Sequence, residues 1–364
     1  MKKKVLAVLF AMLLMVAFAA CGGGESEGEG EAEESTTDVK VGFVYIGDAN
    51  DQGFSNSHEA ARLAVEQELG VTTMALENVP DNADSEKAMR DLIDQGCNVI
   101  IGCSFGYGDT MEKLAGEFTD VKFLHASGYK SNDTNFVNFF GKIYKARYLS
   151  GIAAGLKTES NQIGYVAAMP IPEVIRGINA FTLGVRSVNP DATVEVIWTG
   201  QWGDASLEKP AAVELVNKGC DVLAYHQDTV TTELVAQEKG VSVVGYHYPT
   251  PDVAPESYLT AAVWNWTPYY VEQIQKIIDG TWTAENYWGP EVVALDTLTA
   301  LCAEGTQEKV DEAQAQLDSG WDVFTGPIKD QNGEVKIAEG VVLTDEELLA
   351  FDWFVEGVIG TITN

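Results

Sequence analysis

DLIDQGCNVIIG, residues 91–102, has a partner in ELVNKGCDVLAY, residues 214–225, far along the same chain. Each stretch reads as the end of a helix, a glycine that caps it, a cysteine, and then a strand rich in β-branched residues. Helix–glycine–strand units are common in α/β proteins, so the match could be coincidence. The shared cysteine and the similar elements around each copy favour two lobes with related topology.

The sequence on either side of each copy alternates strand and helix patterns. Around the first copy, strands are expected at 39–47, 97–104 and 121–127 and helices at 56–70, 85–96 and 107–118. Around the second, strands are expected at 161–170, 193–200, 220–227 and 241–248 and helices at 172–188, 209–219 and 231–240. This alternation predicts α/β lobes with parallel sheets and helices on both faces. An N-capping box is expected at Asn56 and Glu59, and a hairpin turn at 332–333.

The N-terminal residues predict export. Three lysines at 2–4 precede an apolar run over 5–20, which is too short for a membrane span and typical of a secretory signal. Cys21 follows directly, an arrangement that resembles the bacterial lipobox, in which the cysteine is acylated, although Phe18 stands where leucine is usual. An ordinary secreted protein with a stray thiol is the alternative. Residues 21–38, rich in glycine and glutamate, are expected to be a flexible acidic tether.

Composition narrows the classes of partner. The chain has 364 residues and a net charge of −32. The length left after the tether favours two lobes, and the acidity argues against nucleic acid and anionic lipid headgroups as partners. No CxxC pair occurs, so a zinc ribbon is not expected. The remaining cysteines are expected to be small buried residues, with a disulfide left open: Cys97, Cys103, Cys220 and Cys302.

Enzyme and cofactor motifs are mostly missing. The sequence contains no GxGxxG, GxxxxGK[ST] or HExxH pattern. A nucleophilic pair of Cys103 with His125 and a calcium loop over 48–59 are conceivable, but the spacing supports neither well. We therefore expect no catalytic residue, no metal and no cofactor.

Aromatic and polar residues gather where the expected strands end, and open α/β sheets bind ligands there. Phe54 and Trp202 lie in glycine-containing loops beside aspartates and are expected in a pocket, whereas Tyr165, Trp282 and Trp288 are expected in lobe cores. Such rings stack on a flat heterocycle, and carboxylates or amides read its edges. The further ligand-binding candidates are Asp48, Phe105, Tyr129, Asp204, Asp228, Tyr246 and Asn265.

Several segments, among them GFVYIGDANDQGFSNSHEAAR (42–62), IPEVIRGINAFTLG (171–184) and VWNWTPYYVEQIQKIIDGTW (263–282), resemble the basic membrane protein family. That family comprises substrate-binding lipoproteins of ABC importers, similar to purine nucleoside receptors. The resemblance covers about residues 39–360. It implies the periplasmic-binding-protein type I fold, with two lobes joined by a three-stranded hinge. The lobes are expected over 39–158 plus about 259–290, and over 159–258 plus about 291–364.

The resemblance also suggests roles for individual positions. Phe54 and Trp202 fall where the family places opposing base-stacking rings, and Asp48 falls near its first acidic loop residue. Asn265 lies in the segment where nucleoside-binding members carry a lysine that contacts ribose, and no lysine occurs there. The GYHYP loop (245–249) also lacks the aspartate of nucleoside binders. These departures favour a free base such as adenine.

The leading hypothesis is therefore a monomeric receptor, lipid-anchored at the outer face of the cytoplasmic membrane, that delivers a purine to an ABC permease. A sugar or autoinducer receptor of the same fold is the first alternative. A surface nucleoside hydrolase and a signalling lipoprotein without a transporter are further alternatives.

Overall fold

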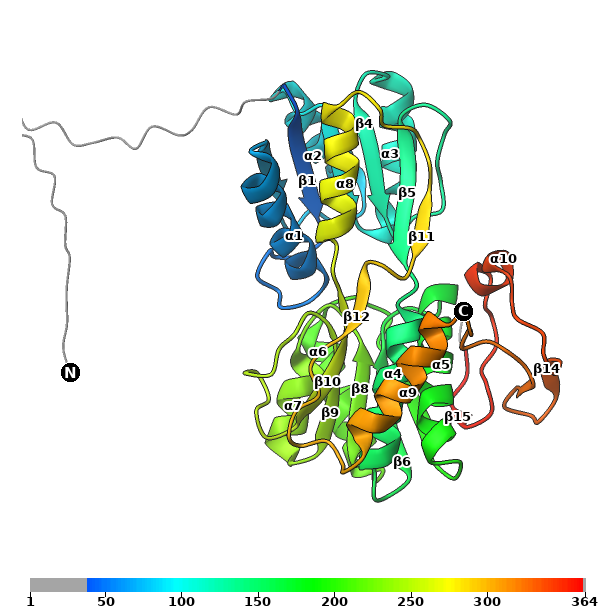
Figure 1. Cartoon of the computed structure of the whole chain (residues 1–364). Helices are drawn as coiled ribbons and strands as arrows, with labels where there is room; N and C mark the ends of the chain where they lie inside the picture. The colour runs from blue at the N-terminus through cyan, green and yellow to red at the C-terminus, as the bar shows by residue number, and fades with distance from the viewer. Residues whose placement is uncertain (1–37, 363–364) are drawn as a thin grey trace, which may run out of the picture. The chain divides into compact units, whose positions relative to one another are not determined.

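The computed structural model describes residues 38–362. The expected signal peptide (1–20), the expected lipidation site Cys21 and nearly all of the expected tether lie outside the described residues. Between 38 and 362 the chain folds into two α/β lobes (Figure 1). No helix within this range is long and apolar enough to cross a membrane.

The first lobe holds a six-stranded sheet in the order β11-β5-β4-β3-β1-β2, and every pairing in it is parallel. Its strands are β1 (Lys40–Tyr45), β2 (Thr72–Leu76), β3 (Val99–Cys103), β4 (Lys122–Ala126), β5 (Phe136–Gly141) and β11 (Tyr287–Gly289). Its helices are α1 (Phe54–Leu69), α2 (Ala83–Asp94), the 3-10 turn η1 (Phe105–Tyr107), α3 (Gly108–Glu117) and α8 (Thr267–Ile278).

The second lobe holds a seven-stranded sheet in the order β12-β10-β9-β8-β6-β7-β15, in which only β12 is antiparallel to its neighbour. Its strands are β6 (Gln162–Ala167), β7 (Thr193–Trp198), β8 (Val222–His226), β9 (Ser242–His247), β10 (Tyr258–Trp264), β12 (Val293–Leu295) and β15 (Val358–Ile359). Its helices are α4 (Tyr144–Lys157), α5 (Pro172–Val188), α6 (Ala205–Asn217), α7 (Thr231–Lys239) and α9 (Thr306–Asp318).

A C-terminal segment, residues 320–362, follows α9. It contains the antiparallel hairpin β13 (Ile328–Lys329) and β14 (Val335–Ile337), the short helix α10 (Asp345–Leu349), and β15, which adds to the edge of the second sheet beside β7. The hairpin turns at 332–333 as the sequence predicts, and Thr344 with Glu347 forms a capping box at the start of α10.

The repeated sequence motif marks equivalent places in the two sheets. β3 lies beside β1 in the first sheet and β8 lies beside β6 in the second, so both sheets share one strand order. Gly96 and Gly219 both adopt left-handed φ values, +91° and +106°, which close each helix without steric cost. The prediction of two lobes with related topology is confirmed.

The chain passes between the sheets three times, after β5, after β10 and after β11, which forms the expected three-stranded hinge (Figure 1). Two of the expected lobe boundaries are displaced. α4, expected in the first lobe, packs on α5 and α9 of the second, and β10, expected in the first lobe, pairs with β9. Sequence periodicity defines a strand or helix but does not show which sheet receives it, so the crossovers fall near 142 and 265 rather than at 158 and 259.

Two local expectations have different outcomes. The capping box at Asn56 and Glu59 is wrong, because α1 begins at Phe54, and Asp51 accepts from the backbone N–H groups of Gly53, Ser55 and Asn56 instead. The four inner cysteines carry free thiols. Three are buried as expected, and Cys302 is partly exposed.

Candidate functional site

A cleft of about 730 Å³ lies between the lobes and is lined from both of them. Most of its lining residues lie at or just after the carboxyl ends of β1, β3 and β4 in the first lobe and of β6, β7, β8 and β9 in the second, and the others belong mainly to β5, β11 and α10. This is where open parallel sheets bind ligands, because helix N-termini and loop side chains converge there. The volume falls in the range of about 300–1,000 Å³ that is typical of small-molecule sites.

Six of the nine ligand-binding candidates line this cleft. They are Phe54, Phe105 and Tyr129 from the first lobe and Trp202, Asp228 and Tyr246 from the second. Phe105 and Tyr129 are exposed and face each other with ring centroids 6.0 Å apart. The structure therefore gathers residues that are up to about 190 positions apart in sequence, as parallel strand ends at one sheet edge should do.

Three candidates lie outside the cleft, and each has a structural role. The exposed carboxylate of Asp48 accepts from the backbone N–H of Asn50 in a local turn. Asp204 caps α6 by accepting from the N–H of Ser206. Asn265 is exposed on the second crossover, where its N–H donates to the carbonyl of Val292. These three residues do not line the cleft, and turn and cap residues resemble site residues in sequence.

Phe54 and Trp202 occupy opposite lobes of the same cleft. Phe54 opens α1, is 7% exposed, and packs edge-on against His58 at 4.5 Å and at a tilt against His247 at 5.4 Å. Trp202 is half-buried in the loop before α6, and its carbonyl accepts from the N–H of Asp228. Each lobe therefore contributes one aromatic ring to the lining of the cleft, and Asp228 lies beside Trp202.

The lobes are in close contact at Gly53. A Cβ atom on Gly53 would lie 2.1 Å from the backbone carbonyl oxygen of Asp228, in the opposite lobe. Only a residue without a side chain permits this contact. Asp51, which holds this loop, has its pKa raised to about 6, mainly by burial, with the Asp228 carboxylate adding to the effect.

Asp228 and His247 form a polar pair on the second-lobe wall. Nδ1 of His247 accepts from the indole N–H of Trp264 at 2.9 Å, so the neutral ring carries its proton on Nε2, 3.1 Å from Oδ1 of Asp228. Burial holds the pKa of His247 well below its ordinary value. Burial also raises the pKa of Asp228 to about 7, against the lowering effect of His226. A carboxyl group in this state can accept a hydrogen bond from a ligand amine or donate one to a ring nitrogen.

A second group, which the sequence reasoning missed, surrounds the N-terminus of α5. Oε2 of Glu173 lies 3.0 Å from Nε2 of His226, and both residues line the cleft beside the buried Arg176. Burial opposes the ionised form of Glu173, but His226 and Arg176 outweigh it and hold its pKa below the ordinary value. Burial lowers the pKa of His226, and the nearby Glu173 carboxylate opposes that effect. The strand-end segment AMPIPEV (168–174) contains Glu173 and could have signalled it.

Trp288 packs against the core of the second lobe, as expected, but is only partly buried and also lines the cleft. Its ring lies under two cations, with Nζ of Lys142 at 4.7 Å and the guanidinium carbon of Arg176 at 5.2 Å. Tyr165, in contrast, is fully buried as expected. His247, Asp345 and Leu349 are further lining residues that the sequence reasoning did not single out.

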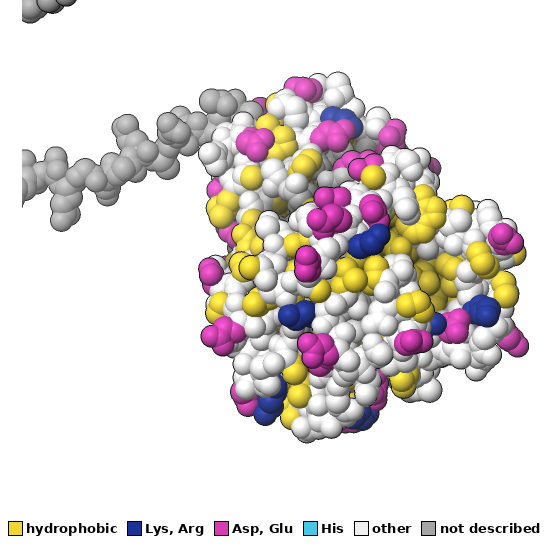
Figure 2. Space-filling view, turned by 60° about the horizontal axis from the view of Figure 1, so that its bottom comes forward, with side chains coloured by type: hydrophobic (Ala, Val, Ile, Leu, Met, Phe, Trp, Pro, Cys, Tyr) yellow, Lys and Arg dark blue, Asp and Glu magenta, His cyan; other side chains and the backbone are white. Residues whose placement is uncertain are grey.

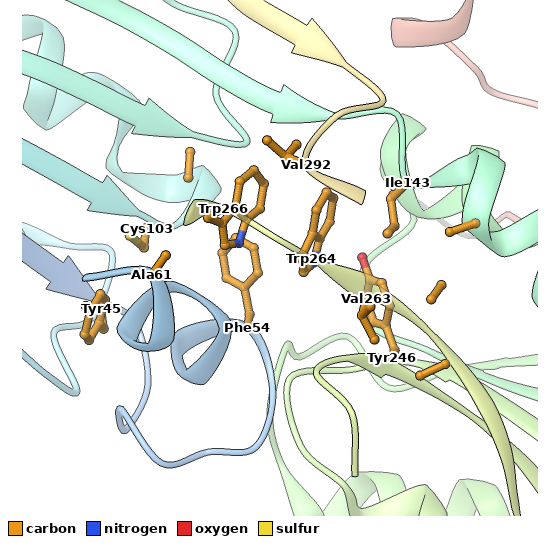
Figure 3. Packing of buried hydrophobic residues seen from close by; sticks show 14 of the residues in the cluster. Tyr45, Phe54, Ala61, Cys103, Ile143, Tyr246, Val263, Trp264, Trp266 and Val292 are labelled. Carbon is orange, nitrogen blue, oxygen red and sulfur yellow. The ribbon is translucent and has the colours of Figure 1, made fainter. Parts of the chain in front are cut away.

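Two stacked tryptophans on the second crossover connect the walls of the cleft (Figure 3). Trp264 ends β10 and donates to His247 in the second lobe, whereas Trp266 precedes α8 and donates to Oγ of Ser57 in the first. Their rings lie 4.5 Å apart at 16°. Phe54 lies near both rings, at 6.4 and 6.5 Å, so the hinge and the cleft share one aromatic cluster.

The described residues give no geometric support to a nucleophilic Cys103–His125 pair or to a metal site. Cys103 is buried beside the Tyr270 hydroxyl, and burial raises its thiol pKa. His125 donates to the carbonyl of Ser104 rather than to a thiolate. Within residues 38–362, no three His, Cys, Asp or Glu side chains are grouped so that they could hold a metal ion.

Comparison with known proteins gives concordant results. Residues 38–319 match the family described as ABC transporter substrate-binding protein PnrA-like, or Bmp. A purine-binding protein of Brucella abortus is 37% identical over 326 residues, which is 88% of this chain and 93% of that protein. A putative ABC transporter glucose-binding protein of Haloferax volcanii, TsgA13, is 37% identical over 292 residues, 79% of this chain and 74% of that protein.

Solved structures agree on the fold. A solute-binding protein of an ABC transporter system from Aeropyrum pernix superposes with a TM-score of 0.70 at 16% identity, covering 86% of this chain and 98% of that one. The chain has the expected periplasmic-binding-protein type I fold, and it belongs to the Bmp family of PnrA-like ABC transporter substrate-binding proteins.

Proposed function

We propose that this substrate-binding protein captures a purine, as a base or nucleoside with an adenine-like ring favoured, and delivers it to an ABC permease. The observation that carries the proposal is the placement of Phe54 and Trp202 on opposite lobes of one cleft, with Asp228 beside Trp202. Two rings can stack on the faces of a heterocycle, and a carboxyl group with a pKa of about 7 can pair with its edge. The purine-binding relative supports this choice of ligand.

The first experiment identifies the ligand. Protein purified under native conditions is analysed by mass spectrometry for retained small molecules, and a thermal-shift panel then compares adenine, other bases, nucleosides and sugars. A ligand present at 100 times its Kd should stabilise the protein by about 2.7 kcal/mol. Stabilisation by glucose but by no purine would favour the sugar receptor. Conversion of a nucleoside during the assay would favour the hydrolase.

Replacing Trp202 by alanine tests whether its ring stacks on the ligand. Loss of one stacked ring costs about 1–3 kcal/mol, so we expect the Kd for the purine to rise roughly 5- to 150-fold while the free energy of unfolding changes little. Trp282→Ala is the matched control, because Trp282 is also partly exposed but packs against Lys122, away from the cleft. Equal affinities of wild type and Trp202→Ala in calorimetry would remove Trp202 from the site.

The same proposal places the protein at the outer face of the cytoplasmic membrane, anchored through an acylated Cys21. The protein would act there as a monomer that docks on the permease. The lipobox-like sequence before Cys21 supports the anchor. Several acyl chains on one residue bind a bilayer firmly, at about 0.8 kcal/mol per buried methylene. We expect the full-length chain in the membrane fraction and Cys21→Ala in the soluble fraction. Membrane retention of Cys21→Ala would contradict acylation at this residue.

A further inference from the structure

Arg147, on α4, is a buried cation behind the second-lobe wall of the cleft. The residue is fully buried and does not itself line the cleft. Its Nη1 donates to the carbonyl of Tyr225 at 2.9 Å, whereas Nε and Nη2 have no hydrogen-bond partner among residues 38–362. No carboxylate is therefore bonded to this guanidinium group. Burial of a charge without a bonded counter-ion is unfavourable, so the fold keeps this cation at some cost in stability.

The acidity of the chain makes this arrangement unusual. The sequence has 55 acidic and 23 basic side chains, and acidic side chains also outnumber basic ones on the face shown in Figure 2. Carboxylates are thus available to most cations, and Arg62, Arg90 and Arg186 each form an ion pair with a glutamate. Arg147 has an aromatic partner instead.

That partner is a ring of the cleft wall. The guanidinium carbon of Arg147 lies 3.5 Å from the centroid of the Tyr246 ring, which is a cation–π contact. Tyr246 lines the cleft, and its ring lies 4.5 Å from the ring of His226 and 3.6 Å from that of His247. The bond to the carbonyl of Tyr225 holds the end of the neighbouring strand, β8. Arg147 thus contacts the ends of both strands, β8 and β9, that carry the two cleft-lining histidines.

The positive charge of Arg147 acts on the same two histidines. Burial is the main cause that lowers the pKa of His247, and the nearby His226 and Arg147 add to it. Burial also lowers the pKa of His226, where Glu173 opposes the effect and Arg147 adds to it. The charged and titratable groups that face the two histidines are Arg147 on α4, Glu173 on α5, Asp228 after β8, Tyr246 on β9 and His58 on α1.

The hydrogen bond between His247 and Trp264 depends on the charge of the histidine. Nδ1 of His247 accepts from the indole N–H of Trp264 at 2.9 Å, so this nitrogen carries no proton. A proton on Nδ1 would set two N–H donors against each other and break the contact with the second crossover. Because a neighbouring cation disfavours a second positive charge, Arg147 favours the ring state that this bond requires.

We propose that Arg147 is a positioning residue of the ligand site, which holds Tyr246, His226 and His247 in the arrangement and charge with which they face the ligand. This inference rests on the proposed purine function. A neutral heterocycle is recognised through the donors and acceptors of the wall. Their pattern must therefore stay the same over the pH range in which histidine ordinarily titrates, and a group behind the wall can fix it without touching the ligand.

Two substitutions separate the charge of Arg147 from its shape. Arg147→Gln removes the charge but keeps a donor for the Tyr225 carbonyl, and Arg147→Lys keeps the charge but lacks the planar fork of arginine. NMR follows the titration of the four histidines in the ligand-free proteins. We expect His226 and His247 to bind a proton at higher pH in Arg147→Gln than in wild type, and at the wild-type pH in Arg147→Lys. His125, on β4 of the first lobe, is the internal reference and should titrate alike in all three proteins.

Calorimetry then measures the binding of adenine, or of another purine that the ligand panel identifies, between about pH 8 and pH 5.5. Arg147→Gln should bind about tenfold more weakly than wild type, because the cation–π contact that orients Tyr246 is lost. It should also lose more affinity than wild type toward the acidic end, because protonation of His247 breaks the bond to Trp264. The unfolding midpoint should stay close to that of wild type, since replacing a buried charge by a neutral group of similar size is often neutral for stability.

Arg186→Gln is the matched control. Arg186 also donates to a backbone carbonyl of the second lobe, that of Ala192, but it does not line the cleft. Its substitution should change neither the affinity nor the pH dependence of binding.

The proposal is overturned if the histidines of Arg147→Gln titrate as in wild type, or if its affinity stays within about twofold of wild type. Equal histidine shifts in Arg147→Gln and Arg147→Lys would also overturn it, because the charge would then not be the cause. Should Arg147→Gln not fold, Arg147→Lys decides. Weaker purine binding with wild-type histidine titrations supports the proposal, and wild-type affinity contradicts it. If no purine binds wild type, the proposed function fails, whereas the histidine titrations still test what Arg147 does to the wall.

Discussion

Gly53→Ala should weaken ligand binding by about 3 kcal/mol, on the order of 100-fold in Kd, without unfolding the protein. The added Cβ would lie 2.1 Å from the carbonyl oxygen of Asp228 and 2.8 Å from its carbonyl carbon. Both are backbone atoms, so no rotamer change can relieve the contact. The atoms that the added Cβ would meet belong to the opposite lobe, so the substitution acts on the contact between the lobes.

The lobes can relieve this clash by separating, which is why affinity should change and stability should not. A ligand that binds only the closed arrangement has its apparent affinity reduced by the fraction of closed molecules. Calorimetry with the purine identified by the ligand panel measures the affinity, and small-angle scattering measures whether the ligand still reduces the radius of gyration. Gly116→Ala is the control, because a Cβ at Gly116 on α3 would meet no atom within 4 Å. Affinity of Gly53→Ala within about twofold of wild type would show that this contact does not govern closure.

Much of the fold could be predicted because the two lobes repeat one local pattern. The glycine–cysteine motifs at 96–97 and 219–220 mark the same strand position in both sheets, and each has the left-handed glycine that helix closure requires. The lobe boundaries were less predictable. α4 and β10 have unambiguous local patterns, but their lobe is decided by packing against α5, α9 and β9, which lie elsewhere in the sequence.

For the cleft, too, local sequence patterns identified some of the lining residues but also selected residues that do not line it. Phe54, Trp202 and Asp228 could be found because glycine-containing loops at strand ends are where parallel sheets bind ligands. Asp48 and Asp204 lie in similar loops, yet their carboxylates are used by backbone N–H groups two residues on, an arrangement that a turn or a helix start also produces.

Residues from the hinge and the C-terminal segment could not be predicted in the same way. Trp288 looks like a core residue until Lys142 and Arg176 are seen on its faces. Leu349 lies on a helix of five residues whose place beside the cleft depends on the buried Arg176. In both cases the signal is a contact between segments far apart in the chain, which a single sequence does not record.

Trp266→Ala should lower the free energy of unfolding by about 3–5 kcal/mol, the largest stability effect that we expect from a single substitution in this chain. Trp266 is 1% exposed and its ring stacks on His58 at 4.8 Å and on Trp264 at 4.5 Å. Its indole N–H donates to Oγ of Ser57, so truncation leaves both a large cavity and a buried hydroxyl without its donor. Because these contacts lie on a crossover, both lobes should lose stability.

Guanidinium chloride unfolding measures the loss through the shift of the midpoint at constant slope. A two-lobed chain can unfold in steps, so fluorescence and circular dichroism transitions are compared before one free energy is assigned. Trp321→Ala is the control, since Trp321 is partly exposed and packs on Tyr148 in the second lobe alone. A cost for Trp266→Ala below about 1 kcal/mol, or no larger than that for Trp321→Ala, would mean that the stacked tryptophans do not hold the hinge. A large cost with coincident transitions would indicate that this crossover couples the unfolding of the two lobes. The stacked pair is bonded to both of them, because Trp264 donates to His247 in the second lobe and Trp266 donates to Ser57 in the first.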